Sequence, residues 1–76
     1  MDAELKEMLK KVDRYAKAMK AKLRLKAKQG FSGGLDPAFR NNVENKLFTH
    51  VARQIRGENQ SVDIGNLAMM LWKEGK

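Results

Sequence analysis

The chain opens, at residues 2–29, with the stretch DAELKEMLKKVDRYAKAMKAKLRLKAKQ, and this stretch decides the fold class. Apolar side chains recur in it at steps of three and four residues, which is the spacing of one face of an α-helix. Most other positions hold Ala, Lys, Leu, Met or Glu, which are good helix formers. The stretch therefore predicts one long amphipathic helix. Its apolar face consists of Leu5, Met8, Leu9, Val12, Ala16, Met19, Leu23 and Ala27.

The excess positive charge of the chain lies in the same stretch. The 76 residues carry a formal net charge of +7. Residues 1–29 contain ten Lys or Arg and four Asp or Glu, for a net charge of +6, and residues 30–76 carry the remaining +1. Such a basic helix attracts polyanions, although many basic helix faces are only solvated. Our candidates for contacting a partner from this helix are Lys10, Arg14 and Lys17.

A second helix is expected at residues 36–56, after a glycine-rich connection. The connection, residues 29–35, is interpreted as a hinge between helices, because it neither follows a strand nor has the spacing of a phosphate-binding loop. Asp36 is a suitable N-cap and Pro37 is a suitable first residue. Gly57 suits the end of the helix. The apolar face of this helix consists of Phe39, Val43, Leu47, Val51 and Ile55, with Phe48 alongside.

A third helix is expected at residues 61–74. Ser61 is a reasonable N-cap, and the negative charge of Asp63 in the first turn suits the helix dipole. The apolar residues cover more than one face, which is typical of a helix surrounded by neighbours. We therefore expect this helix to be the most buried. Its apolar residues are Ile64, Leu67, Ala68, Leu71, Met69, Met70 and Trp72.

These elements predict a single all-α domain over residues 1–76, made of a long basic helix and a helical hairpin. So short a chain buries only about 60% of its unfolded surface, and it has no cysteine for a disulfide. Burial between subunits is the expected supplement, so we expect a homo-oligomer. The lack of cysteine, the acidic start and the absence of an apolar run long enough to span a bilayer favour a cytoplasmic protein.

Few residues are candidates for catalysis. The chain has no cysteine nucleophile, and its single histidine, His50, lies beside the apolar stripe of the second helix, where a structural or surface role is more usual. Asp63 and Asn66 are three residues apart on the third helix, so both can face one partner or ion. The simpler alternative is that Asp63 only complements the helix dipole and that Asn66 is a polar edge residue.

Residues 61–72, SVDIGNLAMMLW, resemble the closing helix of phage and prophage MazG-like nucleotide pyrophosphohydrolases, in which an Asp-Val-Ala-Asn-Phe-Ala-Met-Met pattern is typical. Residues 18–23 and the Lys- and Gly-rich residues 26–34 resemble the first helix and the following connection of that family. Residues 47–57 resemble the shortened second helix of some phage members. The resemblance covers most of residues 15–72, and its last helix is the most specific part.

The resemblance implies an oligomeric all-α bundle. In active members it also implies hydrolysis of nucleoside triphosphates to monophosphate and pyrophosphate. Active members hold Mg²⁺ with an E-x-x-E and an E-x-x-D motif, because Mg²⁺ demands hard oxygen ligands. Asp63 matches the final carboxylate, whereas Gln60 stands in place of its partner Glu. His50 and Arg53 occupy the best match to the E-x-x-E positions, and Arg has no acceptor atom for a metal.

Two functions are therefore expected. The first is a short phage-type MazG-like protein of the host cytoplasm that lacks most metal-binding carboxylates and is a non-catalytic or nucleotide-binding remnant. If the family activity is retained, it is a Mg²⁺-dependent nucleoside triphosphate pyrophosphohydrolase. His50, Arg53 and Asn66 are then candidates for nucleotide binding, and Asp63 is the candidate metal ligand. The alternative is a basic helical module that docks on nucleic acid or on an acidic host protein to regulate it. A membrane partner is not expected, because the apolar stripe is better used against the other helices.

Overall fold

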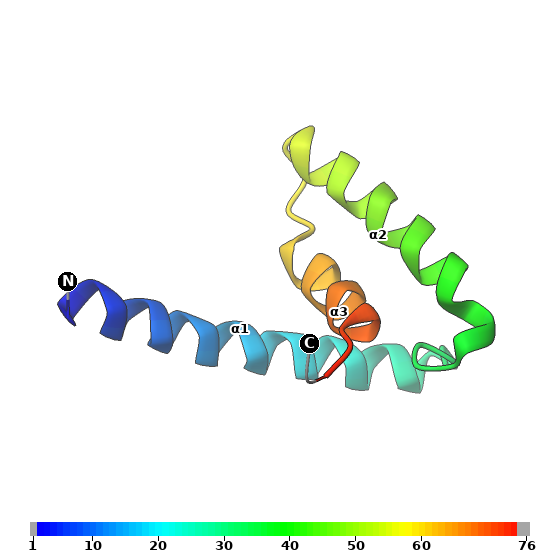
Figure 1. Cartoon of the computed structure of the whole chain (residues 1–76), viewed down its shortest axis with the longest axis horizontal. Coiled ribbons are helices and arrows are strands. Elements are labelled where there is room, and N and C mark those ends of the chain that lie inside the picture. Colours follow the sequence, from blue (N-terminus) through cyan, green and yellow to red (C-terminus); the bar gives the residue numbers. More distant parts are fainter. Residues whose placement is uncertain (1, 75–76) are drawn as a thin grey trace.

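The computed structural model describes residues 2–74, and within that range the chain is all-α with three helices. Figure 1 shows α1 as a long rod, with α2 rising at an angle from one end of the rod and α3 between the two. No helix in the described range is long and apolar enough to cross a membrane. The elements are α1 (Asp2–Lys28), the 3-10 turn η1 (Pro37–Phe39), α2 (Arg40–Ile55) and α3 (Ser61–Leu71).

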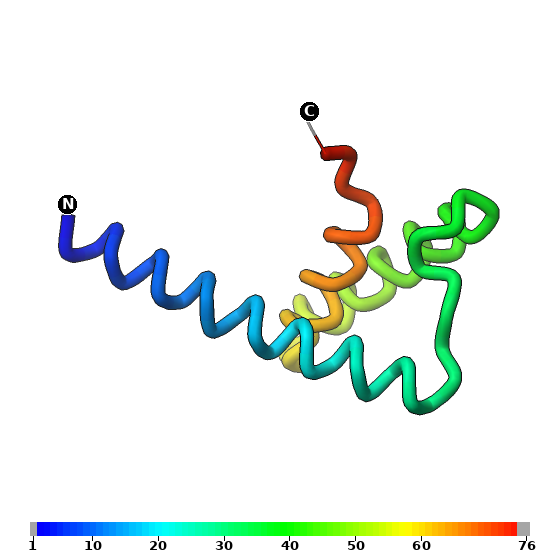
Figure 2. The backbone as a smooth tube through the Cα atoms, turned by 90° about the horizontal axis from the view of Figure 1, so that it is seen from below, coloured from blue at the N-terminus to red at the C-terminus, as the bar shows by residue number. Residues whose placement is uncertain are grey.

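The third helix holds the other two together. Helix α3 packs against both α1 and α2, whereas α1 and α2 do not contact each other within residues 2–74. The two views in Figures 1 and 2 agree that α3 crosses α1 near the middle of its length. The first half of α1 projects beyond the other helices as a free arm. The molecule is thus a three-helix frame with one long extension.

Both long helices end at a glycine in the left-handed region. Gly30 has a φ of 89°, and the next amide, of Phe31, donates to the carbonyl of Lys26 at 3.0 Å. This bond is the 6→1 hydrogen bond of a Schellman motif, which satisfies a carbonyl at the helix end. Gly57, with a φ of 98°, ends α2 in the same way. The prediction of Gly57 as the stop is confirmed, although each helix ends one residue earlier than expected.

The start of the second helix differs from the expectation. The carboxylate of Asp36 accepts from the amide of Ala38 at 2.9 Å, so the predicted cap is confirmed. The residues that it caps form the 3-10 turn Pro37–Phe39, and α2 itself begins at Arg40. The expected start at residue 36 was therefore too early by one turn. The capped turn continues directly into the α-helix.

The third helix is shorter than expected at its C-terminus and is capped differently. Its N-cap is Gln60, without a side-chain cap bond, and Ser61 is its first helical residue. The prediction of Ser61 as the N-cap was wrong by one position. The helix ends at Leu71 because Trp72 is extended, with a ψ of 127°. The expected end at residue 74 was therefore wrong.

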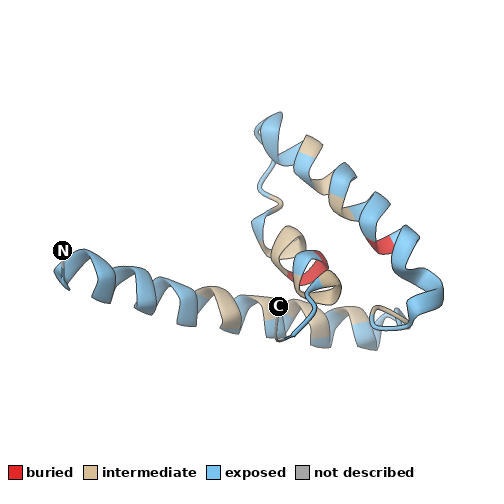
Figure 3. Ribbon diagram, viewed as in Figure 1, coloured by how far each residue is buried: buried red, intermediate tan, exposed pale blue. Residues whose placement is uncertain are grey.

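The hydrophobic core is thin. In residues 2–74 only two apolar residues are buried, Val43 of α2 and Leu67 of α3, and neither is completely inaccessible. Figure 3 shows the first half of α1 exposed along its length. No other part of the described chain covers the apolar stripe of α1 in this half. The outer face of α2 is also open, since Phe48 and Ile55 are 77% and 80% exposed.

Helices α1 and α3 meet at a glycine. A Cβ atom built on Gly65 would overlap the Tyr15 side chain and would lie 3.1 Å from the Met19 sulfur. The Tyr15 hydroxyl donates to the carbonyl of Ser61, which ties the start of α3 to α1. A larger residue at this position would push the two helices apart. The frame therefore requires a residue without a side chain at position 65.

We predict that Gly65→Ala destabilises the protein by about 1–3 kcal/mol, because the added methyl group overlaps Tyr15. In a helix without this contact, the same change stabilises by about 1 kcal/mol. Thermal unfolding followed by circular dichroism therefore distinguishes the two cases by the sign of the change. Adding Tyr15→Phe, which removes the overlapping hydroxyl, should restore part of the loss. A higher midpoint for Gly65→Ala alone would contradict the close contact.

Candidate functional site

A cavity of about 750 Å³ lies inside the three-helix frame. Its walls come from the second half of α1, the loop before η1, and the inner faces of α2 and α3. The loop packs closely on α3: a Cβ atom built on Gly34 would lie only 2.8 Å from the Met70 sulfur. The cavity has four cationic side chains and one carboxylate on its walls. These are Lys22, Lys26, Lys46 and Arg53, and Asp63.

Asn66 of α3 contributes the one buried polar side chain of the described residues. It is 5% exposed, and its Nδ2 donates to the carbonyl of Met19 at 3.1 Å. Its Oδ1 atom has no hydrogen-bond partner, and the residue lies in the cavity wall. An unpaired buried acceptor costs about 1–3 kcal/mol. A ligand that donates a hydrogen bond to this atom would recover that cost.

Asp63 lies beside a lysine. Its Oδ1 is 3.8 Å from Nζ of Lys22, and both side chains are partly exposed. Ion pairs of this exposure contribute at most about 1 kcal/mol. The carboxylate thus neutralises one of the four cationic groups of the cavity. The other three cationic side chains give the cavity a net positive charge, which favours an anionic ligand.

His50 connects the end of α2 to the start of α3. Its Nδ1 donates to Oε1 of Gln60 at 2.5 Å, and both residues are half-buried. The amide of Gln60 in turn donates to Oε1 of Gln54 at 2.6 Å. These bonds fix the link between the two helices. His50 also lies in the cavity wall, so it has both a structural position and access to a ligand.

The residues of this chain do not fit a magnesium site. Within residues 2–74, no group of three or more His, Asp and Glu is placed to hold a metal ion. Asp63 is paired with a lysine, and the oxygen of Gln60 accepts from His50. His50 and Arg53 offer no carboxylate. The assignment of Asp63 as a metal ligand stays a prediction that requires acidic groups from outside this chain.

The structure separates the predicted binding residues into two sets. His50, Arg53 and Asn66 line the cavity together with Asp63. The other set lies on α1 outside the cavity wall, where Nζ of Lys10 is 3.6 Å from a carboxylate oxygen of Glu7. That set is Lys10, Arg14 and Lys17.

Three lysines of the cavity, Lys22, Lys26 and Lys46, were not singled out from the sequence. Lys22 and Lys26 lie one turn apart on α1, inside the basic half of the helix. The ammonium of Lys26 lies over the ring of Phe31, 4.8 Å from its centroid, which is a cation–π contact. The sequence shows that Lys22 and Lys26 share a helix face, because they are four residues apart. It does not show that this face of α1 turns toward the other helices.

Comparison of the chain with protein-family models, with curated proteins and with solved structures found no match. The resemblance to the MazG-like family, carried by residues 61–72, therefore stays a prediction.

We predict that His50→Ala and Gln60→Ala each destabilise the protein by about 1 kcal/mol, because each removes the hydrogen bond between α2 and α3. The double variant should cost little more than either single variant, since the two residues act through one bond. Urea unfolding followed by circular dichroism measures all three. Glu58→Ala, at an exposed side chain two residues away, is the matched control and should cost less. Additive losses in the double variant would show that the bond contributes nothing.

Proposed function

We propose that this protein binds a nucleotide in the cavity of the three-helix frame and holds its phosphate groups with cationic side chains rather than with a metal ion. The observation that carries the proposal is the charge of the wall, with four Lys or Arg against a single carboxylate. Arg binds phosphate oxygens with two parallel hydrogen bonds, and Lys acts as a point charge. Such a wall favours an anion even after Asp63 has neutralised Lys22.

The rest of the cavity suits the apolar part of a nucleotide. Its volume of about 750 Å³ lies within the range of about 300–1,000 Å³ that is usual for small-molecule sites. Phe31 and Phe39 provide aromatic surface in the wall. Asn66 adds a polar amide side chain to this wall.

The resemblance to MazG-like proteins supports the same class of ligand. It implies a nucleoside triphosphate as the ligand and an oligomeric all-α bundle, and in active members of that family hydrolysis of the triphosphate depends on Mg²⁺. Because the carboxylates of residues 2–74 are not grouped to hold a metal ion, the proposal is binding without hydrolysis. In this role Arg53 and the cavity lysines provide the positive charge that Mg²⁺ supplies in active relatives.

We expect isothermal titration calorimetry with dATP, dGTP, dCTP or dTTP in the presence of EDTA to show binding of at least one of them. Arg53→Gln should weaken that binding by about tenfold, because a charge-assisted hydrogen bond contributes about 1.5–3 kcal/mol. Lys10→Gln is the matched control, since Lys10 lies outside the cavity, and it should leave the affinity unchanged.

Two results would contradict this proposal. One is the absence of heat and of any thermal stabilisation with all four nucleotides. The other is release of pyrophosphate when the protein is incubated with a nucleotide and Mg²⁺ or Mn²⁺, which would reveal an enzyme. An enzyme would in turn require carboxylates that another chain contributes to the site.

A second candidate function is docking on nucleic acid through α1. Residues 15–28 contain six Lys or Arg and no Asp or Glu, and several of these cations face away from the cavity. A helix with this charge is attracted to the phosphate backbone without reading its sequence. The exposed cations outside the cavity wall are Lys17, Lys20, Arg24 and Lys28.

If α1 docks on nucleic acid, the affinity for a fluorescent DNA duplex should fall steeply with salt, with a log–log slope of about −0.9 for each phosphate contacted. Replacing both Lys17 and Lys20 by Gln should make the slope shallower by the equivalent of about two phosphate contacts. Fluorescence anisotropy over a salt series measures both quantities. A flat salt response, or a slope unchanged in the double variant, would exclude this function.

A further inference from the structure

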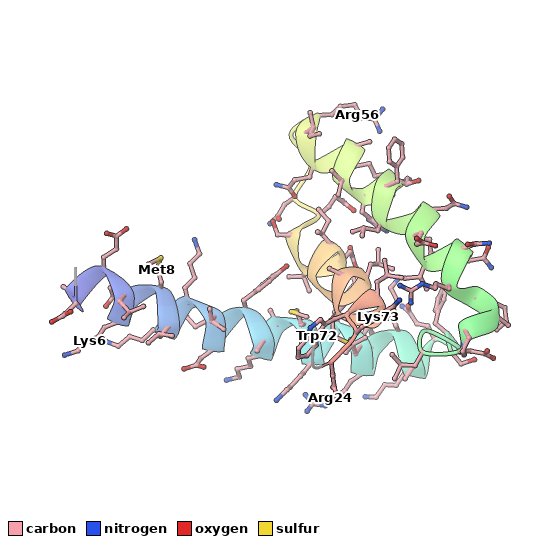
Figure 4. All side chains as sticks on the ribbon, in the orientation of Figure 1. Lys6, Met8, Arg24, Arg56, Trp72 and Lys73 are labelled. Atoms are coloured by element: carbon pink, nitrogen blue, oxygen red, sulfur yellow. The ribbon has the colours of Figure 1, made fainter. Side chains whose placement is uncertain are left out.

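The arm of α1, residues 2–14, has an apolar stripe that no other part of the described chain covers. The four large apolar side chains of the stripe are each about half exposed or more, from 51% to 60%. In Figure 4, Met8 and Lys6 point to opposite sides of the arm. The stripe consists of Leu5, Met8, Leu9 and Val12.

The apolar residues of this stripe have the spacing of a helix-pairing surface. Leu5, Met8 and Val12 follow the alternating three- and four-residue steps by which paired helices bury a seam, and Leu9 widens the seam on one side. A contiguous apolar surface that stays open on a small protein marks an interaction site. Because so little apolar surface is buried within the frame, the chain gains stability from covering this stripe.

The charges of the arm identify what covers it. Residues 2–7 carry three acidic groups and one lysine, for a net charge of −2. Residues 8–14 carry three Lys or Arg and one aspartate, for a net charge of +2. The arm as a whole is neutral, so it does not attract nucleic acid or an anionic membrane. A second arm in the opposite direction would place each acidic half beside a basic half.

We propose that two copies of this protein associate through their arms, with residues 2–14 of the two chains antiparallel. The two-fold axis lies between Met8 and Leu9. Leu5 of one chain then faces Val12 of the partner subunit, and Met8 faces Leu9 of the partner subunit. A parallel pair would instead place the two −2 halves together and the two +2 halves together, and it would align the two helix dipoles unfavourably.

The expected dimer is of modest affinity. An arm of 13 residues is about 20 Å long. A single helix face of this length buries less surface than a standard interface, which buries about 800 Å² per partner. We therefore expect the dimer to dissociate in the micromolar range of protein concentration. Its association does not involve the cavity, so the proposal stands or falls separately from nucleotide binding.

Engineered cysteines test the direction of pairing, because the natural chain contains none. Leu5→Cys and Val12→Cys chains of different tag length are mixed and oxidised mildly, and the products are separated by size under denaturing conditions. The antiparallel pair gives a disulfide-linked product of the two different chains. Each variant alone gives little product. Efficient linkage of Leu5→Cys to itself, or no linkage in the mixture, would overturn the proposal.

Sedimentation equilibrium tests the surface itself. Leu9→Lys should raise the dimer dissociation constant by about tenfold or more, since it puts a charge into the centre of the seam. Ile55→Lys, at a side chain that is 80% exposed on the outer face of α2, is the matched control and should not change it. A protein that is monomeric at all concentrations would overturn the proposal, as would dissociation by Ile55→Lys but not by Leu9→Lys.

Discussion

The fold depends on one close contact, between α3 and the middle of α1. Gly65 brings the backbone of α3 against the side chains of Tyr15 and Met19, and Asn66 then reaches the carbonyl of Met19. Because α3 is the one element of the described chain that touches both long helices, loss of this contact would leave α1 as a separate helix. The cavity depends on the same contact, since its walls come from all three helices and the loop.

The local part of this fold is predictable from sequence, because helix ends depend on neighbouring residues. Gly30 and Gly57 adopt the left-handed conformation that other residues avoid, and Asp36 accepts the hydrogen bond expected of a cap. Some helix ends were still misplaced, as at the start of α2 and the end of α3, and the largest error arose where distant residues decide the outcome. The pattern of α1 shows an apolar stripe over its whole length, and it does not reveal that α3 reaches only the second half.

The candidate site was predictable only in part for the same reason. Asp63 with Asn66, and His50 with Arg53, share helix faces by their three-residue spacing, and all four line the cavity. Lys22 joins them through a contact with a residue some forty positions away, which periodicity within one helix does not report. Lysines selected for their place on the basic stripe of α1 lie instead outside the cavity.

If the arms of α1 pair as proposed, the number of helical residues in the chain depends on protein concentration. A helix segment of about 13 residues is marginal in water when nothing packs on it, and residues 2–14 have only their propensity and a surface pair between Glu7 and Lys10. In dilute solution we therefore expect the arm to fray and its amide hydrogens to exchange with solvent faster than those of the frame. The association proposed above would then also have to order part of two chains, and this entropy cost would keep it reversible.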